Sequence, residues 1–494
     1  MKLKIDISGR AVRVVLFSFL MFFPLSFLAP GVTAYAGQGK TSGPKIKKPI
    51  KNKKSEFTFK PLKNEEIPAG AKNITVIDLK TALRLALENY PGIQSSKYSY
   101  ISSVYNKNET LYNYFPQISA GGIYSRETVM SVSSAGAGIP PTFKNNGGIN
   151  YMINDYQADL NATWLIYSFG GRHYSYLASL NQMKVSKYAY SQETNSDLYN
   201  VVLNFAQYFE NSEIEKADLE NLKNNEIAYK AAEAFYRVGT GNLVDAETAK
   251  ASMETARAEY INSKFNSKIS RLALINSIGL PLNGKYQFVN TLMAGGFNEN
   301  IGDLIKKGLK NSPLLLQSIY EVKSEKASVN EAKTGYYPSL SASFSYTGVN
   351  SVFPLNRNYA AGISLSVPIF NGFLTTNKVA SSKALLFSSI WNRRLTEQNL
   401  IYTISQDYYG IKSQYLTIAA LKQSEKASKL AYELALKSYK VGVGSMVQLV
   451  TANSQYISSL TSYINSKYTY YYLKDKLYSD IGLLYSHYFG KEKK

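Results

Sequence analysis

The chain has no cysteine and only two histidines, His173 and His487, among its 494 residues. Without cysteine there is no disulfide framework to hold a small secreted fold together, and no thiol that could carry a lipid anchor. Zinc clusters and Cys–His nucleophiles need several such side chains in one place, so both kinds of site are excluded. We therefore expect no enzymatic activity, no metal and no cofactor.

Long apolar runs are missing after the first 36 residues. Within those 36, a basic segment precedes an apolar core from Val14 to Leu28, and a small-x-small cleavage motif stands at 34–36. This order predicts a secretory signal peptide, because the core is too short for a membrane-spanning helix. No later stretch approaches the roughly 18 apolar residues that such a helix needs. A membrane role would therefore have to depend on strands.

Acidic residues are scarce, since 35 Asp and Glu face 56 Lys and Arg, giving a formal net charge of +21. Much of the excess lies in 37–63, where nine lysines accompany Glu56 alone. This composition predicts a disordered basic arm over 37–72. Its simplest role is a solvated tail, and contact with lipid head groups or peptidoglycan is the alternative. The 41 tyrosines suit membrane belts and a wet tunnel, so no nucleic-acid partner is expected.

After the arm, the sequence contains two similar copies of one long segment. Pro91 corresponds to Pro313, 222 positions later, and Tyr236 corresponds to Tyr439 at an offset of 203. Copies of about 200 residues are too long for a solenoid repeat and indicate a duplicated domain. The predicted parts are the signal peptide 1–36, the arm 37–72, a first repeat 73–290, a second repeat 291–486 and a charged tail 487–494.

In each copy, apolar residues first recur at the spacing of a helix and then alternate with polar residues as in a strand. Asp78 is a good N-cap for the first helix, and Pro91 restarts a helix that is expected to run to Tyr114 before Pro116 ends it. Apolar residues then alternate with small or polar ones, which predicts hairpins over 117–167 and 339–370. Strands of about ten residues with one apolar face have the length of tilted strands in a bilayer. A soluble antiparallel hairpin packed on a core is the plainer alternative.

An unusually long helical segment comes after each hairpin. Residues 172–238 contain no Gly or Pro, and 374–441 contain one Gly. A helix of that length reaches about 100 Å and needs coiled-coil packing for stability. Glycine-bearing turns at 238–242 and 441–445, with Asn242 and Ser445 as natural N-caps, predict a reversal into a shorter antiparallel helix.

The four predicted strands cannot form a closed barrel within one chain. An open sheet edge in hydrocarbon leaves backbone groups unpaired, at several kcal/mol each. Known single-chain barrels begin at eight strands. If these strands span a bilayer, several chains must therefore contribute to one barrel.

Several segments carry a resemblance to a known family. They are "IDLKTALRLALENYPGIQ", "YFPQISAGGIYSR", "LIYSFGGR" with "VPIFNGF", and the paired turns "YRVGTGNLVDAETA" and "YKVGVGSMVQLVTA". In this order and duplicated, they resemble the TolC-type outer membrane efflux proteins. The resemblance implies a mixed α/β membrane protein in the outer membrane of a Gram-negative-type cell. A homotrimer would close a 12-strand β-barrel, and long antiparallel coiled-coil helices would form a periplasmic α-barrel.

The same resemblance implies an exit duct of a tripartite efflux or type I secretion system. Its partners would be outer membrane lipid, a periplasmic adaptor protein and an inner-membrane RND, ABC or MFS transporter. The expected adaptor-docking tips are Arg237, Val238, Gly239, Thr240, Lys440, Val441, Gly442 and Ser445. The expected periplasmic gate comprises Asp245, Tyr439, Gln448 and Thr451.

This chain departs from the family pattern at the second tip. Gln448 and Thr451 stand where acidic residues are frequent, and Gly444 stands where a basic gate residue is expected. The gate would then be weaker or built differently. The plainer alternatives are that the tip glycines only cap and reverse helices, and that the gate residues lie on a solvated helix face.

Two other functions remain open for this sequence. One is a soluble periplasmic or surface coiled-coil scaffold without channel activity. The other is a secreted basic protein that binds anionic polymers through its lysine-rich arm. Recovery of a trimer from outer membranes, together with single-channel conductance, separates the duct from both.

Overall fold

The computed structural model describes residues 6–7, 10–11, 76–130, 150–292 and 295–490. The chain divides into two compact units, Met1–Asn64 and Glu65–Lys494. In the first, two short strands, β1 (Asp6–Ile7) and β2 (Arg10–Ala11), pair antiparallel. Apart from these strands, the predicted signal peptide and basic arm lie outside the described residues. All further elements belong to the second unit.

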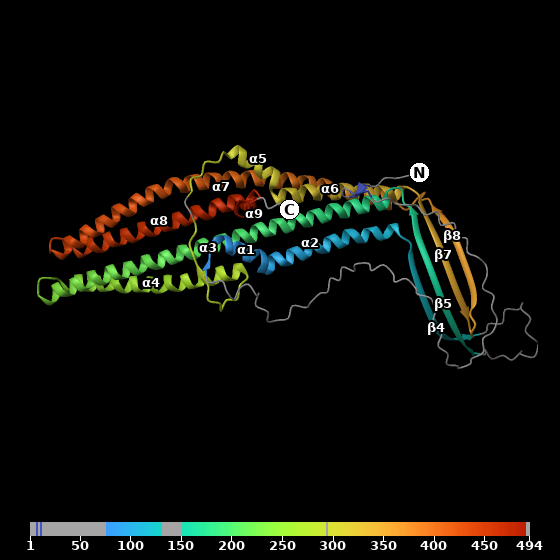
Figure 1. The fold of residues 1–494 in the computed structure, drawn as a ribbon, viewed down its shortest axis with the longest axis horizontal. Helices are drawn as coiled ribbons and strands as arrows, with labels where there is room; N and C mark the ends of the chain where they lie inside the picture. The colour runs from blue at the N-terminus through green and yellow to red at the C-terminus, as the bar shows by residue number, and fades with distance from the viewer. Residues whose placement is uncertain (1–5, 8–9, 12–75, 131–149, 293–294, 491–494) are drawn as a thin grey trace, which may run out of the picture. The chain divides into compact units, whose positions relative to one another are not determined.

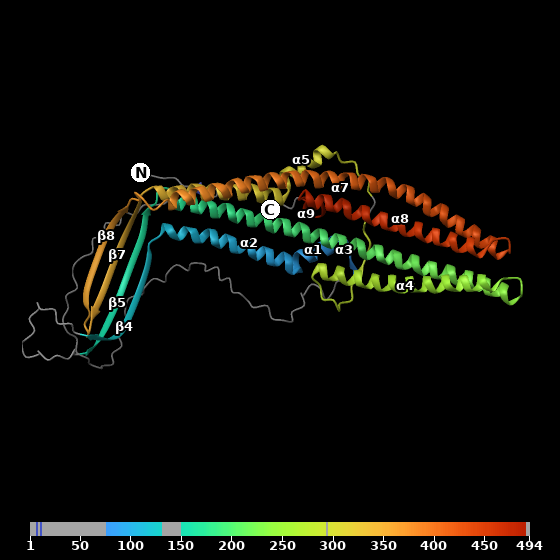
Figure 2. The ribbon, with the colours of Figure 1, turned by 180° about the vertical axis from the view of Figure 1, so that it is seen from behind.

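The second unit repeats one order of elements, as the sequence predicts (Figures 1 and 2). The first copy comprises α1 (Leu79–Asn89), α2 (Pro91–Glu109), the 3-10 helix η2 (Thr110–Tyr114), β4 (Gln117–Met130), β5 (Asn150–Tyr167), α3 (Gly171–Arg237) and α4 (Leu243–Ile278). The second comprises α5 (Ile301–Asn311), α6 (Pro313–Lys333), η4 (Thr334–Tyr336), β7 (Ser339–Asn350), β8 (Asn356–Ser366), α7 (Leu374–Lys440) and α8 (Met446–Asp480). Outside this repeat are β3 (Val76–Ile77), which pairs in parallel with β6 (Gln287–Phe288), and the C-terminal helix α9 (Leu484–Phe489).

The helix boundaries result from local chemistry. The Asp78 side chain accepts a hydrogen bond from the Thr81 backbone N–H at 2.8 Å and so caps α1. Pro91 occupies the first turn of α2, where its missing N–H costs nothing. The second helix was expected to run to Tyr114, and its last turn proves to be the 3-10 helix η2. Tightening of the final turn before a proline satisfies carbonyls that would otherwise be unpaired.

The four hairpin strands form one antiparallel sheet in the order β4–β5–β7–β8. The two hairpins share a register, because Tyr124 lies opposite Tyr156 in the first and Tyr346 opposite Tyr359 in the second. The strands hold 14, 18, 12 and 11 residues, so those of the first copy are longer than predicted. The second hairpin ends at Ser366 instead of 370, since Pro368 has no N–H to donate to a ladder. The residues between β4 and β5 lie outside the described ranges.

The register gathers the predicted apolar residues on one face of this sheet. Paired residues share a face, so the pairs Ala120–Leu160, Leu160–Tyr346 and Ala342–Ile363 make that face continuous across all four strands. The side chains that it carries are Ile118, Ala120, Tyr124, Tyr156, Ala158, Leu160, Ala162, Trp164, Leu340, Ala342, Phe344, Tyr346, Tyr359, Ala361, Ile363 and Leu365. The opposite face carries mainly serine, asparagine, glutamine and aspartate. The alternation of apolar and polar residues is confirmed, and the predicted apolar residues that lie within the strands all share the same face of the sheet.

An arginine fixes the passage from β5 into α3. The Arg172 guanidinium donates to the carbonyl oxygens of Leu165 at 2.8 Å, Ile166 at 2.6 Å and Asn113 at 3.1 Å. The pairing of β5 with β7 is irregular between Leu165 and Tyr167, so the Leu165 and Ile166 carbonyls lie at a bulge, whereas that of Asn113 belongs to η2. The guanidinium also lies 4.7 Å from the centre of the Tyr114 ring. One side chain therefore joins η2, the strand end and the start of the long helix.

Replacing Arg172 with methionine is expected to lower the free energy of unfolding by about 2–3 kcal/mol, because charged hydrogen bonds to three carbonyls are lost together. Thr375 occupies the equivalent position of the second copy and bonds Asn371 at 2.6 Å instead. Thr375→Val therefore serves as the matched control, with an expected loss of about 1 kcal/mol. Thermal unfolding in detergent measures both. Equal losses would show that Arg172 has no special role at this junction.

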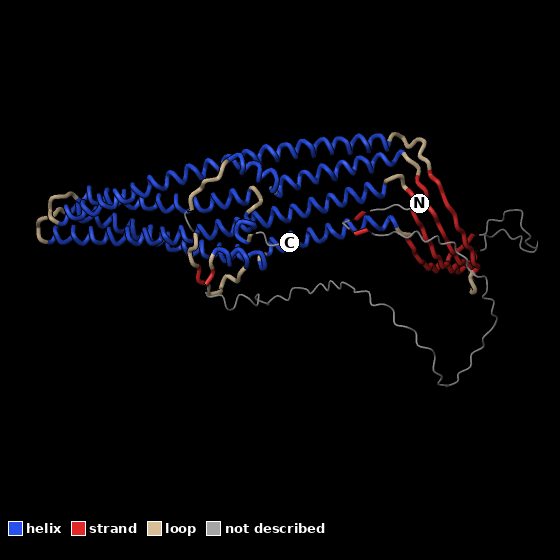
Figure 3. Tube along the Cα trace, turned by 45° about the horizontal axis from the view of Figure 1, so that its top comes forward, coloured by secondary structure: helices blue, strands red, loops and turns tan. Residues whose placement is uncertain are grey.

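The long helices form two antiparallel pairs, α3 with α4 and α7 with α8. Within the second unit, Figure 3 shows the sheet strands at one end of the helices and the α3–α4 and α7–α8 turns at the other. α3 and α7 each hold 67 residues, which corresponds to about 100 Å. In the described residues, no helix combines the length and apolar character needed to cross a membrane.

The largest apolar core lies about midway along α3, and we call this level the waist. There α1 and α9 pack against α3 and α4, with Leu83, Leu198 and Leu484 at most 1% exposed. The charged tail was predicted to begin at 487, but α9 extends to Phe489. The reason is tertiary packing, since Leu484 is buried and the Tyr488 hydroxyl donates to Asp475 at 2.8 Å.

Candidate docking tips and gate

The turn between α3 and α4 is a Schellman motif. Gly239 has a φ of +78°, and the Thr240 N–H donates to the Phe235 carbonyl at 3.0 Å. Asn242 then caps α4 by accepting from the Val244 N–H at 3.0 Å. The predicted helix end, glycine and cap are confirmed at this tip.

The turn between α7 and α8 repeats this geometry. Gly442 has a φ of +81°, and the Val443 N–H donates to the Ser438 carbonyl at 3.1 Å. The Ser445 hydroxyl accepts from the Gln448 N–H at 3.2 Å, so the oxygen of this expected docking residue is engaged in capping α8. Gly444 is also fixed by the turn, because a Cβ there would lie 2.9 Å from the Tyr439 nitrogen. The turn leaves no room for a basic gate side chain at that position.

Both tips expose a cap of aliphatic side chains. Val238 and Val441, at equivalent positions, are each 72% exposed. Their exposed aliphatic neighbours are Leu243, Val244, Val443 and Val447. Around them lie Arg237, which pairs with Glu233 at 2.8 Å, and the exposed Lys440. An exposed apolar patch surrounded by charged residues is typical of a protein-binding surface.

The expected gate residues fall into two groups. Tyr439 is 5% exposed and packs edge-on against Phe235, with the ring centres 5.7 Å apart. Burial raises the pKa of the Tyr439 hydroxyl, and the negative charge of nearby Asp245 adds to that rise. Tyr439 of α7 thus packs on Phe235 of α3 and lies near Asp245 of α4. Gln448 and Thr451 are exposed on α8, and no side-chain hydrogen bond within the described ranges joins them to this pair.

A buried amide network was missed by the sequence reasoning. The Asn453 amide of α8 donates to Asn221 of α3 at 2.8 Å, and Asn224 donates to Asn453 at 3.0 Å. Asn221 also donates to Glu259 of α4 at 3.1 Å. Buried amides that satisfy one another fix the register between helices. Three asparagines within 221–225 are poor helix formers in mid-helix, and this was the available signal.

None of these groups forms a catalytic arrangement. Among the described residues, no cluster of three or more His, Asp or Glu side chains is placed to hold a metal ion. The tips offer shape, apolar surface and charge, which suits binding and gating.

The sequence matches a known family over both copies. A family model described as "Outer membrane efflux protein" matches residues 82–280 and 304–482. The chain is 27% identical over 168 residues to the outer membrane efflux protein BepC of Brucella suis, covering 33% of this chain and 37% of that protein. It is 21% identical over 360 residues, 70% of each protein, to the toluene efflux pump outer membrane protein TtgC of Pseudomonas putida. The match thus spans about a third of the Brucella protein.

Solved structures share the fold. The CmeC outer membrane channel of Campylobacter jejuni superimposes with a TM-score of 0.73 at 19% identity, covering 82% of this chain and 86% of that one. The open state of the MtrE outer membrane channel of Neisseria gonorrhoeae gives 0.67 at 19% identity, covering 82% and 89%.

Proposed function

Because this chain belongs to the outer membrane efflux protein family, we propose that it is the outer-membrane exit duct of a tripartite efflux or type I secretion system. The observation that carries this proposal is the single four-stranded sheet, with one continuous apolar face, joined to helices of about 100 Å. Relatives named for efflux favour small-molecule export over protein secretion.

Closure of the sheet into a barrel requires further copies of the chain. β4 and β8 are the edges of the sheet, and β8 is exposed at every position. Three copies would bring twelve strands together and leave no edge unpaired in hydrocarbon. The apolar face would then meet lipid, with Tyr124, Tyr156 and Trp164 at the levels where aromatic belts lie.

The helices support the same homotrimer. Exposed apolar side chains continue along α7 below the β8 edge: Leu385, Phe387, Trp391, Leu395, Tyr402, Tyr409 and Leu416 are each more than half exposed. A second series lies on α4, where Ile261, Phe265 and Ile269 are exposed. Apolar surface of this extent marks an interface. We assign both series to contacts between neighbouring copies, so that the helices continue the barrel as a periplasmic tube.

The tips would lie at the far end of this tube and receive a periplasmic adaptor coupled to an inner-membrane RND, ABC or MFS transporter. The aliphatic caps at Val238 and Val441 provide the docking surface. Asp245 and Tyr439, with Gln448 and Thr451 on α8, would control the opening. The proposed parts of the chain are the signal peptide 1–36, the arm 37–72, the repeats 73–290 and 291–486, and the charged tail 487–494, whose first three residues belong to α9.

Reconstitution tests the proposal. The protein purified from outer membranes is expected to migrate as a detergent-resistant trimer and to produce discrete conductance steps in a planar bilayer. Recovery as a soluble monomer would instead support the coiled-coil scaffold. Deletion of 37–63 separates the arm from the duct, since assembly and conductance should not change.

A further inference from the structure

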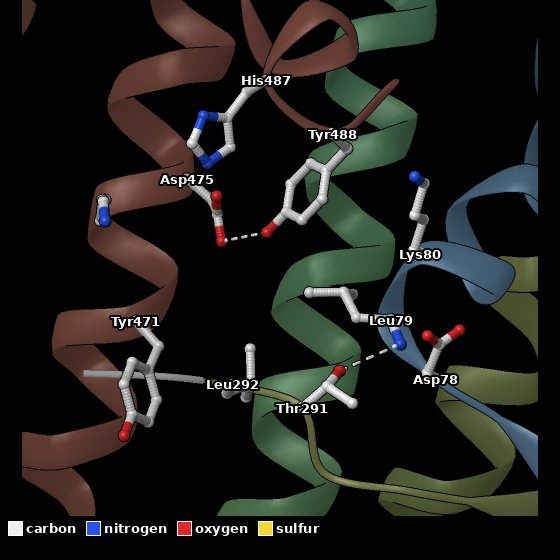
Figure 4. Close-up of a pocket in the computed structure, with 10 residues that line it drawn as sticks. Asp78, Leu79, Lys80, Thr291, Leu292, Tyr471, Asp475, His487 and Tyr488 are labelled. Carbon is white, nitrogen blue, oxygen red and sulfur yellow. Dashed lines mark hydrogen bonds between the residues drawn. The ribbon is translucent and has the colours of Figure 1, made fainter. Parts of the chain in front are cut away.

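Two adjoining cavities lie at the waist, where α1 begins. The first has a volume of ≈ 280 Å³ and the second ≈ 290 Å³. They share Asp78 and Lys80 in their walls. The first is lined further by Leu79, Thr291, Leu292, Tyr471, Lys474, Asp475, His487 and Tyr488, and the second by Thr81, Arg84 and Phe489 (Figure 4). Each is close to the lower size of a small-ligand site.

The side chains that line these cavities carry a net positive charge. Lys80, Arg84 and Lys474 supply three cations, and in the part of the chain that the structure describes none of them forms an ion pair. The two carboxylates of the lining, Asp78 and Asp475, each accept a hydrogen bond from another lining residue, and together they leave the three cations an excess of one positive charge. Asp78 caps α1, and the hydrogen bond from Thr81 holds the pKa of Asp78 below its usual value. Asp475 accepts from the Tyr488 hydroxyl at 2.8 Å (Figure 4).

The aromatic wall of the cavities is held in place by the core. His487 stacks on Tyr478, with ring centres 4.1 Å apart, and Leu484 anchors α9 in the waist. Tyr471 is 8% exposed. A site whose walls are already ordered loses little freedom when a ligand binds. Cations beside flat apolar surfaces suit a peptide that carries carboxylates.

We propose that this cavity pair binds the carboxylate-bearing peptides of the cell wall. This inference rests on the proposed function, which places a column of about 100 Å below the outer membrane. Such a column has to pass through the wall layer. Leu198 of the waist core lies 27 residues after Gly171, or about 40 Å below the sheet. The tips, at the far end of the column, remain free for the adaptor.

The duplication extends the basic surface around the waist. Arg84 of α1 corresponds to Lys306 of α5 at the offset of 222; both are exposed, and Lys306 forms an exposed ion pair with Asp303 at 3.8 Å. Lys310 of α5 lies one helical turn further on. Three copies would therefore present six basic helices as a belt. A surface with an excess of positive charge raises the local concentration of a polyanion near the cavities.

Co-sedimentation of the purified full-length trimer with intact peptidoglycan sacculi tests the site. Lys80→Gln with Arg84→Gln is expected to weaken binding at least tenfold. Lys97→Gln with Lys326→Gln removes the same charge from α2 and α6, away from the cavities, and is expected to leave binding within twofold. Soluble peptide-bearing wall fragments should compete with the sacculi, whereas glycan strands stripped of peptide should not.

Three outcomes would overturn the inference: no binding by the wild type, equal weakening in both double variants, or competition by polyglutamate but not by wall fragments. The second would indicate general charge attraction, and the third an acidic protein segment as the ligand. Conductance is measured on the same preparations. Normal conductance without binding to sacculi would contradict only the proposed binding site. The absence of both trimer and conductance would contradict the proposed duct.

Discussion

Replacing Leu160 with lysine is expected to abolish recovery of the trimer from outer membranes. Leu160 lies at the centre of the apolar face, opposite Ala120 on β4 and Tyr346 on β7. A lysine on the lipid face near the bilayer midplane costs about 2–4 kcal/mol. Three chains would incur that cost together, roughly 6–12 kcal/mol for the trimer. This is comparable with the whole stability of a typical folded protein.

The next residue provides the control. Asn161 lies on the opposite face, where its amide donates to Asp159 at 2.7 Å. A lysine at 161 would face water in the proposed barrel and lie beside that carboxylate, so trimer yield should stay close to wild type. Trimer recovery from outer-membrane fractions measures both variants. If the trimer were recovered with Leu160→Lys but not with Asn161→Lys, the polar face would be the one that meets lipid.

The second large effect is expected at the gate, where Tyr439→Ala should raise the resting conductance at least about tenfold. The tyrosine is buried against Phe235, so its truncation removes about 3 kcal/mol of packing that joins α7 to the first-copy helices. Every 1.4 kcal/mol changes an equilibrium constant about tenfold. Even half of that energy, if it acts on the closed tip, is sufficient for this increase.

The duplicated sequence provides an internal control for this experiment as well. Tyr236 is the first-copy equivalent of Tyr439, yet it is 45% exposed. Tyr236→Ala makes the same chemical change at the same end of the helices without emptying the core, so resting conductance should stay unchanged. Single-channel recordings before and after each change decide the matter. Equal conductance in the two variants would mean that Tyr439 only packs and does not hold the duct closed.

Most of the architecture could be predicted from local sequence. The absence of Gly and Pro from 172–238 predicted α3 to within one residue, because those two residues alone break a helix strongly. Alternation predicted which residues share the apolar sheet face, since side chains on a strand alternate strictly. Asn242 and Ser445 were predicted as caps and act as caps.

The features that sequence could not supply depend on contacts between distant segments. The charged tail was predicted to begin at 487, inside α9, whereas Leu484 and Tyr488 pack into a core formed by much earlier residues. The different burial of Tyr236 and Tyr439 is likewise invisible in two matching motifs. It arises because the second-copy helices pack against the first copy at only one of these positions.

The pairing of β5 with β7 has a consequence for how the ring of strands would be completed. It is a contact between the two copies inside one chain, with Leu160 opposite Tyr346. The repeat offsets carry Leu160 to Ile363 on β8 and Tyr346 back to Tyr124 on β4. In the closed trimer, Ile363 would then lie opposite the partner's Tyr124, again with both side chains on the apolar face. The β5–β7 pairing inside each chain thus has the same geometry as the β8–β4 pairing that would join neighbouring chains. Half of the strand pairings between repeat copies are therefore already formed within the single chain.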